Sequence, residues 1–303
     1  MRLLSWNIQW GRGADGRVDL ARSAAAIRAA GEFDVICLQE VACKLAGLAG
    51  GAREDEVAFF AAAFPEHEPV FGAGLDVPDG EGGRAYFGNL LLSRRPVGQV
   101  FRHLLPSPAD PAYPAMQRVC VEAVVDAPWG PLRVMSTHLE YYSQRQRRAQ
   151  VEALRALQAQ AADLARLPPM GKDASPAFAA RPRPASAVLC GDFNCEPGSD
   201  AYRALQRPLP PPDDAPANAN ANAHPAGALR PNWVDAWPLV HGARPHAPSV
   251  GLHGADWPDR AYCCDFFFVS ADLAPRVRAL EVLADTAASD HQPVVLTLSS
   301  AAG

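Results

Sequence analysis

The sequence predicts an α/β fold, and three observations support this prediction. Short apolar runs alternate with helical segments along most of the chain, as in domains whose sheets are covered by helices. Apolar residues make up 49% of the 303 residues, so a large core can be buried. Polar residues stand at the ends of several apolar runs, where strands would hold them at one sheet edge.

Strands and helices alternate in the first third of the chain. Strands are expected at residues 3–8, 34–39 and 88–93, where apolar residues dominate. Helices are expected at residues 19–30 and 54–63. A glycine follows the first helix as a stop signal, and acidic residues at the start of the second complement the helix dipole.

The middle of the chain predicts a hairpin and a long helix. Residues 119–125 and 132–137 are apolar and flank the turn sequence Pro-Trp-Gly at 128–130. Residues 143–167 form the longest expected helix, because apolar side chains recur there at helical spacing. Three more apolar runs are interpreted as strands, at residues 188–191, 266–269 and 293–298.

Two segments interrupt this pattern. Residues 168–184 are rich in proline and alanine, and residues 208–231 contain consecutive prolines and an alternating Ala-Asn run. Neither segment has the apolar periodicity of a core element, so both are expected to be exposed, mobile loops. The chain keeps the same character on both sides of them. We therefore expect one domain over residues 1–303 with loop insertions near 168–184 and 208–231.

Composition and charge argue against several classes of protein. A net charge of -5 with 20% charged residues suits a soluble protein and argues against binding duplex nucleic acid through bulk positive charge, although local basic patches stay compatible. No run approaches the roughly 20 apolar residues of a membrane span, and the N-terminus lacks the features of a signal peptide. The seven cysteines form no CxxC pair, so we expect buried thiols and a cytoplasmic location.

The apolar runs lead to, or begin at, polar residues of types that take part in catalysis. Each of these residues alone also fits a structural role, such as a turn, a cap or the first solvated position after a strand. Their joint occurrence at strand ends favours a functional site. The residues are Asn7, Glu40, His138, Asp192, Asn194, Asp265, Asp290 and His291.

The ligand types in this set favour a hard metal ion. Glu40, Asp192 and Asp290 supply carboxylate oxygens, and two asparagines supply neutral oxygens. Mg²⁺ prefers such oxygen ligands, and Mn²⁺ is compatible with them. His138 and His291 are interpreted as hydrogen-bond donors or proton carriers, because histidine titrates near neutral pH.

Six motifs resemble the endonuclease/exonuclease/phosphatase superfamily, which has the deoxyribonuclease-I-like fold. They are LLSWNIQWG, DVICLQEV, STHLEYYS, LCGDFNCEPGS, CCDFFFVS and ASDHQPVVL, in the family's order and at its approximate spacing. The resemblance extends from Arg2 to Leu298. It implies a four-layered α/β sandwich, in which two mixed β-sheets pack face to face with helices outside.

The resemblance also implies residue roles at a metal site. Glu40 resembles the principal metal-binding carboxylate, and Asn7 and Asp290 resemble residues close to the metal. The implied cofactor is Mg²⁺, with Mn²⁺ as the compatible alternative. The number of metal ions, one or two, stays open.

Further roles follow from the resemblance for the groups that act on water and phosphate. Asp192 and Asn194 resemble the pair that orients the attacking water and the phosphate, and His138 resembles a donor to a phosphate oxygen. His291 resembles a general base or transition-state stabiliser, and Asp265 resembles the carboxylate that fixes its tautomer. Either Asp192 or His291 can be the base in this family, and the sequence does not separate them.

Three more residues are candidates for binding substrate. Asn89 lies in a segment that matches the family's mid-chain strand, and Arg84 and Arg118 are candidates for holding phosphate. Both arginines are equally compatible with being solvated surface residues that bind no substrate. The sequence departs from the family shortly before Asp265, where an arginine or another polar residue is often found but this chain has Tyr262, Cys263 and Cys264.

The substrate class stays open, because this fold supports several phosphate esters. We favour a nuclease or a nucleotide-type phosphodiesterase that acts by metal-assisted attack of water. A phosphatase or phospholipid esterase is the alternative on the same core, and a catalytically silent binding protein is the alternative from another class. Arginines at 145, 147 and 148 and aromatic residues at 10, 141 and 142 can contact nucleic acid or serve only solvation and packing.

Overall fold

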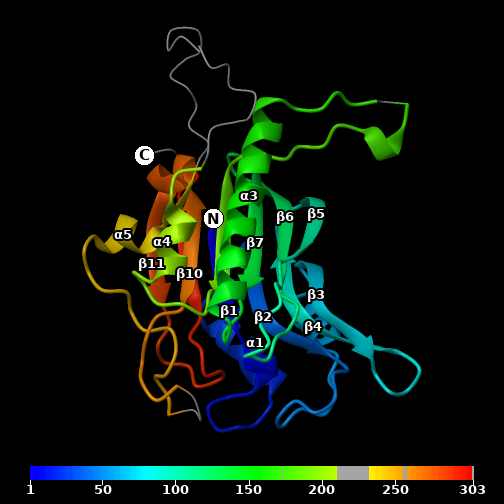
Figure 1. Cartoon of the computed structure of the whole chain (residues 1–303), viewed down its shortest axis with the longest axis vertical. Helices are drawn as coiled ribbons and strands as arrows, with labels where there is room; N and C mark the ends of the chain where they lie inside the picture. Colours follow the sequence, from blue (N-terminus) through cyan, green and yellow to red (C-terminus); the bar gives the residue numbers. More distant parts are fainter. Residues whose placement is uncertain (173, 210–231, 255–257, 302–303) are drawn as a thin grey trace.

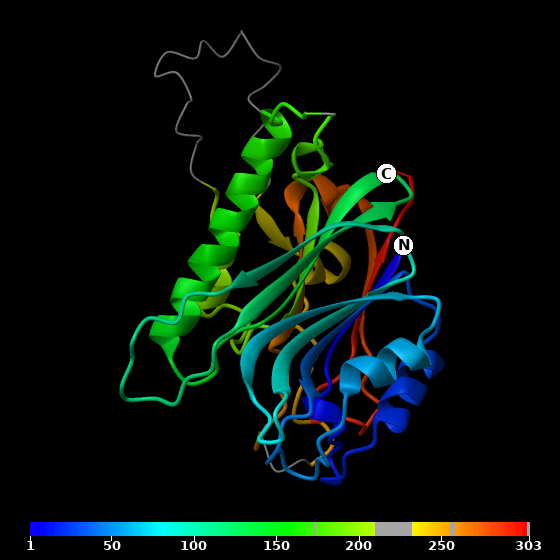
Figure 2. The same ribbon diagram turned by 90° about the vertical axis from the view of Figure 1, so that its right-hand side faces the viewer.

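The computed structural model describes residues 1–172, 174–209, 232–254 and 258–301. These residues form two six-stranded sheets with helices on their outer faces (Figures 1 and 2). The predicted α/β sandwich is therefore confirmed. Most of the second expected loop insertion, residues 210–231, lies outside the described residues.

The first sheet has the strand order β11-β12-β1-β2-β4-β3. Strands β1 and β2 pair in parallel, and the other neighbours in this sheet pair antiparallel. The sheet is therefore mixed, as expected. Its strands are β1 (Arg2–Asn7), β2 (Val35–Cys43), β3 (Glu68–Pro78), β4 (Arg84–Ser93), β11 (Val277–Val282) and β12 (Val294–Leu298).

The second sheet repeats this plan in the order β5-β6-β7-β8-β10-β9. Here β7 and β8 are the parallel pair, and the remaining neighbours are antiparallel. The expected hairpin is the β6–β7 pair. The strands are β5 (Val97–Leu104), β6 (Val119–Ala127), β7 (Gly130–His138), β8 (Ala187–Asp192), β9 (Trp233–Asp235) and β10 (Asp265–Ser270).

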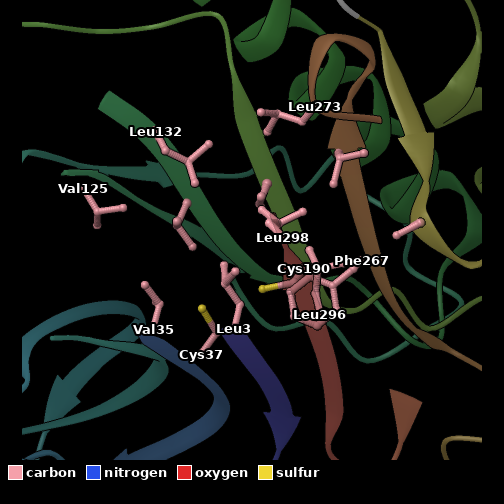
Figure 3. Packing of buried hydrophobic residues seen from close by; sticks show 14 of the residues in the cluster. Leu3, Val35, Cys37, Val125, Leu132, Cys190, Phe267, Leu273, Leu296 and Leu298 are labelled. Atoms are coloured by element: carbon pink, nitrogen blue, oxygen red, sulfur yellow. The ribbon is translucent and has the colours of Figure 1, made fainter. Parts of the chain in front are cut away.

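The central strands are buried on both faces, which explains why they read as continuous apolar runs. In β1, Leu3 points into the core between the sheets, whereas Leu4 points toward the helices outside the first sheet. The core between the sheets also contains Cys37, Cys190 and Phe267, which lie close to Leu3 in Figure 3. Because side chains alternate along a strand, this packing fixes which face each residue occupies.

Helices form the two outer layers. Helices α1 (Leu20–Ala29) and α2 (Glu56–Ala63) pack on the first sheet, and α3 (Gln144–Arg166) and α4 (Asp200–Gln206) pack on the second (Figure 2). A short helix, α5 (Ala236–His241), contacts β10 and β11. The four longer helices each begin after an Asp or Ser whose side chain accepts a backbone N–H, and such a cap contributes about 1 kcal/mol.

The segment at residues 168–184 extends from the end of α3 (Figure 1) and is largely exposed where it is described. It includes a single 3₁₀ turn, Pro176–Phe178. Arg183 ties it to the sheet: its guanidinium donates to Glu122 at 3.2 Å and lies over the ring of Phe101. The sequence did not predict this anchor, and the mobility of the segment stays a prediction.

Two further expectations concern the cysteines and the membrane. All seven cysteines are free and buried, as predicted. Within the described part of the chain, none of the helices is both long enough and apolar enough to cross a membrane. The cytoplasmic location and the single-domain organisation stay predictions.

Candidate active site

The ends of the central strands of both sheets meet at one edge. Asn7 ends β1, His138 ends β7 and Asp192 ends β8. Strand β10 runs in the opposite direction, so its first residue, Asp265, pairs with Asp192 at the same edge. The topology therefore brings together polar residues that are far apart in the sequence.

Glu40 reaches this edge through an irregularity in β2. The pairing of β2 with β4 shifts between Leu38 and Val41, and Glu40 has a φ of 58° in the left-handed region. A residue other than glycine in this region costs of order 1–3 kcal/mol, and such bulges commonly redirect a side chain. The bulge turns Glu40 toward the predicted site instead of leaving it on a regular strand face.

The segment before β12 is fastened to the end of β1. The Ser289 hydroxyl donates to the carbonyl oxygen of Asn7 at 2.8 Å, and the Trp6 indole donates to the carbonyl oxygen of His291 at 3.0 Å. These bonds place Asp290 and His291 next to Asn7.

Asn7 holds two of the carboxylates. Its Nδ2 donates to Glu40 Oε1 at 3.0 Å and to Asp192 Oδ2 at 3.1 Å. Its Oδ1 accepts the backbone N–H of Gln9 at 3.0 Å, and the Gln9 amide in turn donates to Asp290 Oδ2 at 3.0 Å. Asn7 and Gln9 therefore orient three carboxylates within one network.

His291 and Asp265 form a buried pair. His291 Nδ1 lies 2.8 Å from Asp265 Oδ2, which also accepts the hydroxyl of Ser249 at 2.6 Å. Nε2 of the same ring lies 3.6 Å from Asp192 Oδ2. Burial disfavours the charged ring, but the charges of Asp265 and Asp192 outweigh it and hold the pKa of His291 well above its usual value.

His138 has the opposite character. The Asn194 side-chain amide donates to Nε2 of His138 at 2.9 Å, which assigns the ring proton to Nδ1. Burial and the positive charge of Arg118 hold the pKa of His138 well below its usual value. The site therefore contains a neutral imidazole and an imidazolium, because their surroundings shift the two pKa values in opposite directions.

The carboxylates are crowded in a way that suits a divalent cation. Burial and the charge of Asp290 raise the pKa of Glu40 to about 7, and burial raises the pKa of Asp192 to about 6. Gln9 Oε1 is buried beside them and has no hydrogen-bond partner among the described residues. Uncompensated carboxylates beside an orphaned amide oxygen fit a hard metal ion such as Mg²⁺.

Another group of potential ligands fits less well. Asp192, Cys264 and His291 place ligand atoms within 4.8 Å of one another. However, the Cys264 sulfur lies beside Nδ1 of the ring, at 4.0 Å, whereas Asp192 lies beside Nε2. Burial raises the pKa of the Cys264 thiol well above its usual value, and Nδ1 of His291 is already bonded to Asp265. This trio therefore lacks the thiolate that a closed metal site with a cysteine ligand uses.

A cavity of about 500 Å³, which we call the site cavity, opens onto these groups. Asn7 and Asp265 lie behind its lining and are bonded to residues in it. The structure thus brings all eight strand-end residues together. Those that line the cavity are Glu40, His138, Asp192, Asn194, Asp290 and His291.

The three candidate substrate residues have different surroundings. Arg118 lines the site cavity, bonds Glu140 through Nε, and has a buried Nη1 with no hydrogen-bond partner among the described residues. Asn89 is buried and donates to the carbonyl oxygen of Val119, so it lies beside the cavity instead of lining it. Arg84 lies outside the lining, on the exposed β3–β4 hairpin, where it pairs with Asp76.

Two residues of the network escaped the sequence reasoning. Gln9 follows Asn7 by two residues, and this closeness to a predicted site residue was its only signal in the sequence. In the structure its φ is 47°, in the left-handed region. Ser249 lies in a loop with no motif around it. Its contact with Asp265 depends on the folded chain, so no local pattern could have found it.

Comparisons with known proteins identify a sequence family and a shared fold. A sequence model described as the endonuclease/exonuclease/phosphatase family matches residues 4–167. No curated protein matches the sequence. Solved structures resemble the chain over nearly its whole length, at identities below 25%, and so show a shared fold.

Three of these structures illustrate the likeness. An endonuclease/exonuclease/phosphatase from Beutenbergia cavernae has a TM-score of 0.62 and 24% identity, covering 99% of this chain and 72% of that chain. A mannosyl-6-phosphatase from Bacteroides thetaiotaomicron has a TM-score of 0.62 and 16% identity, covering 98% and 99%. The human Nocturnin catalytic domain has a TM-score of 0.61 and 16% identity, covering 99% and 94%.

Proposed function

The chain belongs to the endonuclease/exonuclease/phosphatase family, and from this premise we propose that it is a metal-dependent hydrolase of phosphodiester bonds. The observation that carries the proposal is the hydrogen-bonded network at the sheet edge. It joins a carboxylate cluster, a neutral imidazole and an imidazolium around one cavity. Such a combination suits attack of water on a phosphorus atom.

Glu40 and Asp290 are the proposed ligands of a divalent cation, Mg²⁺ or Mn²⁺. When bound, the cation would neutralise charge on the phosphoryl oxygens and lower the pKa of water. Asn7 uses both its amide atoms in holding Glu40, Asp192 and the backbone of Gln9. We therefore assign it the role of orienting the two carboxylates beside the metal.

Asp192 is the proposed general base. Its Oδ1 accepts the backbone N–H of Asn194 at 2.8 Å, which fixes the carboxylate, and its Oδ2 faces both histidines. It would accept a proton as the oxygen of water forms a bond to phosphorus. The ester P–O bond then breaks, and the leaving alcohol takes up a proton.

His291 and Arg118 are the proposed stabilisers of developing negative charge. His291 is held by Asp265 and carries a proton on the side of the ring that faces Asp192. Arg118 contributes a guanidinium whose buried Nη1 has no hydrogen-bond partner among the residues that the structure describes. Preorganised donors of this kind commonly contribute about 3–4 kcal/mol to the barrier reduction. His138 and Asn194 hold each other in place beside Asp192.

Nucleic acid or a nucleotide is the favoured substrate class. Trp10, Tyr141 and Tyr142 line the site cavity, and the two tyrosines expose 39% and 53% of their surface. Exposed aromatic rings beside a phosphate site suit bases better than a sugar phosphate. The complete set of polar groups argues against the silent binding protein that the sequence left open.

A substrate panel tests the proposal. Purified protein would be incubated with a small activated phosphodiester, single-stranded DNA, RNA, nucleotides, a sugar phosphate and phospholipid vesicles, each with Mg²⁺, Mn²⁺ or chelator. We expect metal-dependent release of product from the diesters and loss of that release in Glu40→Gln. Full activity in excess chelator would contradict the metal, and hydrolysis of monoesters alone would favour the phosphatase alternative.

A further inference from the structure

A second large cavity lies between the start of α3 and helix α4, which are neighbours in Figure 1. Its volume is about 630 Å³, within the range of roughly 300–1,000 Å³ that is typical of ligand pockets. Five of its eleven lining residues are arginines, and a single carboxylate, Asp200, lines it. We call it the arginine groove, after Arg145, Arg147, Arg148, Arg203 and Arg207.

Three of these arginines carry charge that no carboxylate neutralises in the described part of the chain. Arg145 and Arg147 donate to backbone carbonyl oxygens. Arg148 is exposed and makes no hydrogen bond or ion pair with the described residues. In contrast, Arg203 and Arg207 pair with Asp200 and Glu152. The groove is therefore locally positive although the chain carries a net charge of -5.

The position of these arginines is unfavourable for the helix itself. Ser143 caps α3, and the first turn contains no acidic residue to complement the dipole. Cations near a helix N-terminus oppose the partial positive charge there, and each typically costs about 0.3–1 kcal/mol. Solvation of the helix end does not explain why arginines stand where they destabilise the helix. Binding of an anion at this end does explain it.

The groove adjoins the site cavity, although no residue lines both. Asn194 lines the site cavity, and its neighbour Cys195 lines the groove. Tyr141 and Tyr142 line the site cavity just before α3 begins. Arg147 joins the two cavities directly, because its Nη1 donates to the carbonyl oxygens of Glu140 and Tyr141 at 2.7 and 2.8 Å.

The aromatic pair stands at this junction. The rings of Tyr141 and Tyr142 meet edge to face with centroids 4.8 Å apart, and both are exposed. Bases stack on such rings without sequence preference, while arginines bind the intervening phosphates. An aromatic platform followed by a positive groove is the arrangement that single-stranded nucleic acid requires.

We propose that the arginine groove binds the backbone phosphates of a single-stranded nucleic acid that extends from the scissile bond across Tyr141 and Tyr142. The inference rests on the proposed function, because it assumes that the scissile phosphate lies in the site cavity. It predicts that affinity depends on strand length, because only a strand long enough to extend from the scissile bond to α3 and α4 contacts the groove.

The test measures binding separately from cleavage. Fluorescence anisotropy of labelled oligonucleotides, from one to twenty nucleotides long, would be recorded in chelator so that no strand is cut. The variant is Arg148→Glu, because Arg148 makes no hydrogen bond or ion pair with the described part of the chain that the substitution would break. The matched control is Arg278→Glu on β11, an exposed arginine whose substitution changes the net charge equally.

We expect Arg148→Glu to weaken binding of the longest oligonucleotide about ten-fold and to reduce the slope of log affinity against log salt by about one. Mononucleotide binding and hydrolysis of a small diester should change less than two-fold, as should every property of the control. Tyr141→Ala should weaken oligonucleotide binding and leave the salt slope unchanged.

Two results would overturn the inference. One is wild-type affinity of Arg148→Glu for every length of strand. The other is equal binding of inorganic polyphosphate of matched charge, which has no bases to stack on the tyrosines. A wild-type protein that binds the strand at this groove but hydrolyses no phosphodiester with metal would contradict the proposed function and leave the groove assignment standing.

Discussion

The Nδ1 atom of His291 lies 2.8 Å from Oδ2 of Asp265, and this contact turns Nε2 of the ring toward Asp192. Both members of the pair are buried, and Ser249 donates a second hydrogen bond to the same carboxylate oxygen. An imidazolium fixed in this way stabilises a developing charge without having to reorganise. The contact therefore connects a residue that touches no substrate to the proposed chemical step.

Loss of this imidazole should affect turnover and, to a smaller degree, folding. We expect His291→Ala to lower kcat about 10²–10³-fold, the usual range for loss of one preorganised donor to a developing charge. The substitution leaves Asp265 buried with one partner fewer, so the free energy of unfolding should fall by about 1–3 kcal/mol. Asp265→Asn should lower kcat less, because the ring remains. Steady-state kinetics and urea unfolding measure the two effects, and near-normal turnover of His291→Ala would exclude it from the chemistry.

Glu40 provides a prediction about stability in the absence of metal. Burial and Asp290 raise its pKa from 4.5 to about 7, so the unfolded state releases this proton more readily than the folded state. Stability of the metal-free protein should therefore fall as pH rises from about 4.5 to 7, by an amount of the order of 3 kcal/mol. Thermal unfolding in chelator at pH 8 should show Glu40→Gln to be more stable than the wild type.

Added metal should reverse this order. Mg²⁺ binds the folded wild-type protein and raises its unfolding temperature by mass action, whereas Glu40→Gln should respond weakly. The control is Asp76→Asn, an exposed carboxylate on the β3–β4 hairpin. An equal response of the wild type and Glu40→Gln to Mg²⁺ would show that Glu40 is not a ligand.

Much of the fold was accessible from the sequence because the central strands are buried on both sides. The runs that contain Leu3, Ile36 and Leu189 are mostly apolar, and each became a central strand. Strand β3 (Glu68–Pro78) was missed, because its proline and glycine residues disfavour a strand locally. Its pairing with β4 along the whole length overrides that local preference.

The site, like the fold, could be predicted from the sequence in part. Polar residues at strand ends were recognisable, since a strand end is a local feature of the sequence. The bulge that turns Glu40 inward and the contacts of Gln9 and Ser249 are tertiary, so no local pattern announces them. The family resemblance implied a contact between His291 and Asp265, but no local pattern showed that both residues would be buried.

The exposed part of the segment at residues 168–184 should be dispensable. Met170 and Phe178 expose 95% and 68% of their surface. Replacing residues 169–181 with a short Gly-Ser linker, which keeps Arg183, should change the free energy of unfolding by less than about 1 kcal/mol. Arg183→Ala in the intact chain should cost more, because it removes a partner of buried Glu122. A cooperative transition lost on trimming would show that the segment belongs to the core.

Glu122 is the centre of a buried ion cluster far from the site cavity. Its carboxylate contacts Arg133 at 2.9 Å, Arg183 at 3.2 Å and His103 at 2.9 Å, and its side chain is fully buried. Burial opposes its ionisation, but His103 and the two arginines outweigh this effect and lower its pKa to about 2. The folded protein therefore holds Glu122 ionised under conditions in which the unfolded chain takes up a proton.

This difference predicts a pH dependence of stability. Since one pKa unit corresponds to about 1.4 kcal/mol, the shift from 4.5 to about 2 stabilises the fold by roughly 3 kcal/mol above pH 4.5. The contribution declines as pH falls below 4.5 toward 2, because protonation of the unfolded chain then competes. Urea unfolding of Glu122→Gln should show this deficit at pH 7 and a smaller one at each step from pH 4.5 to 3. Glu281→Gln, on a strand at the edge of the other sheet, serves as the control. A deficit of Glu122→Gln that stays constant over this pH range would mean that its charge contributes nothing and that only packing is lost.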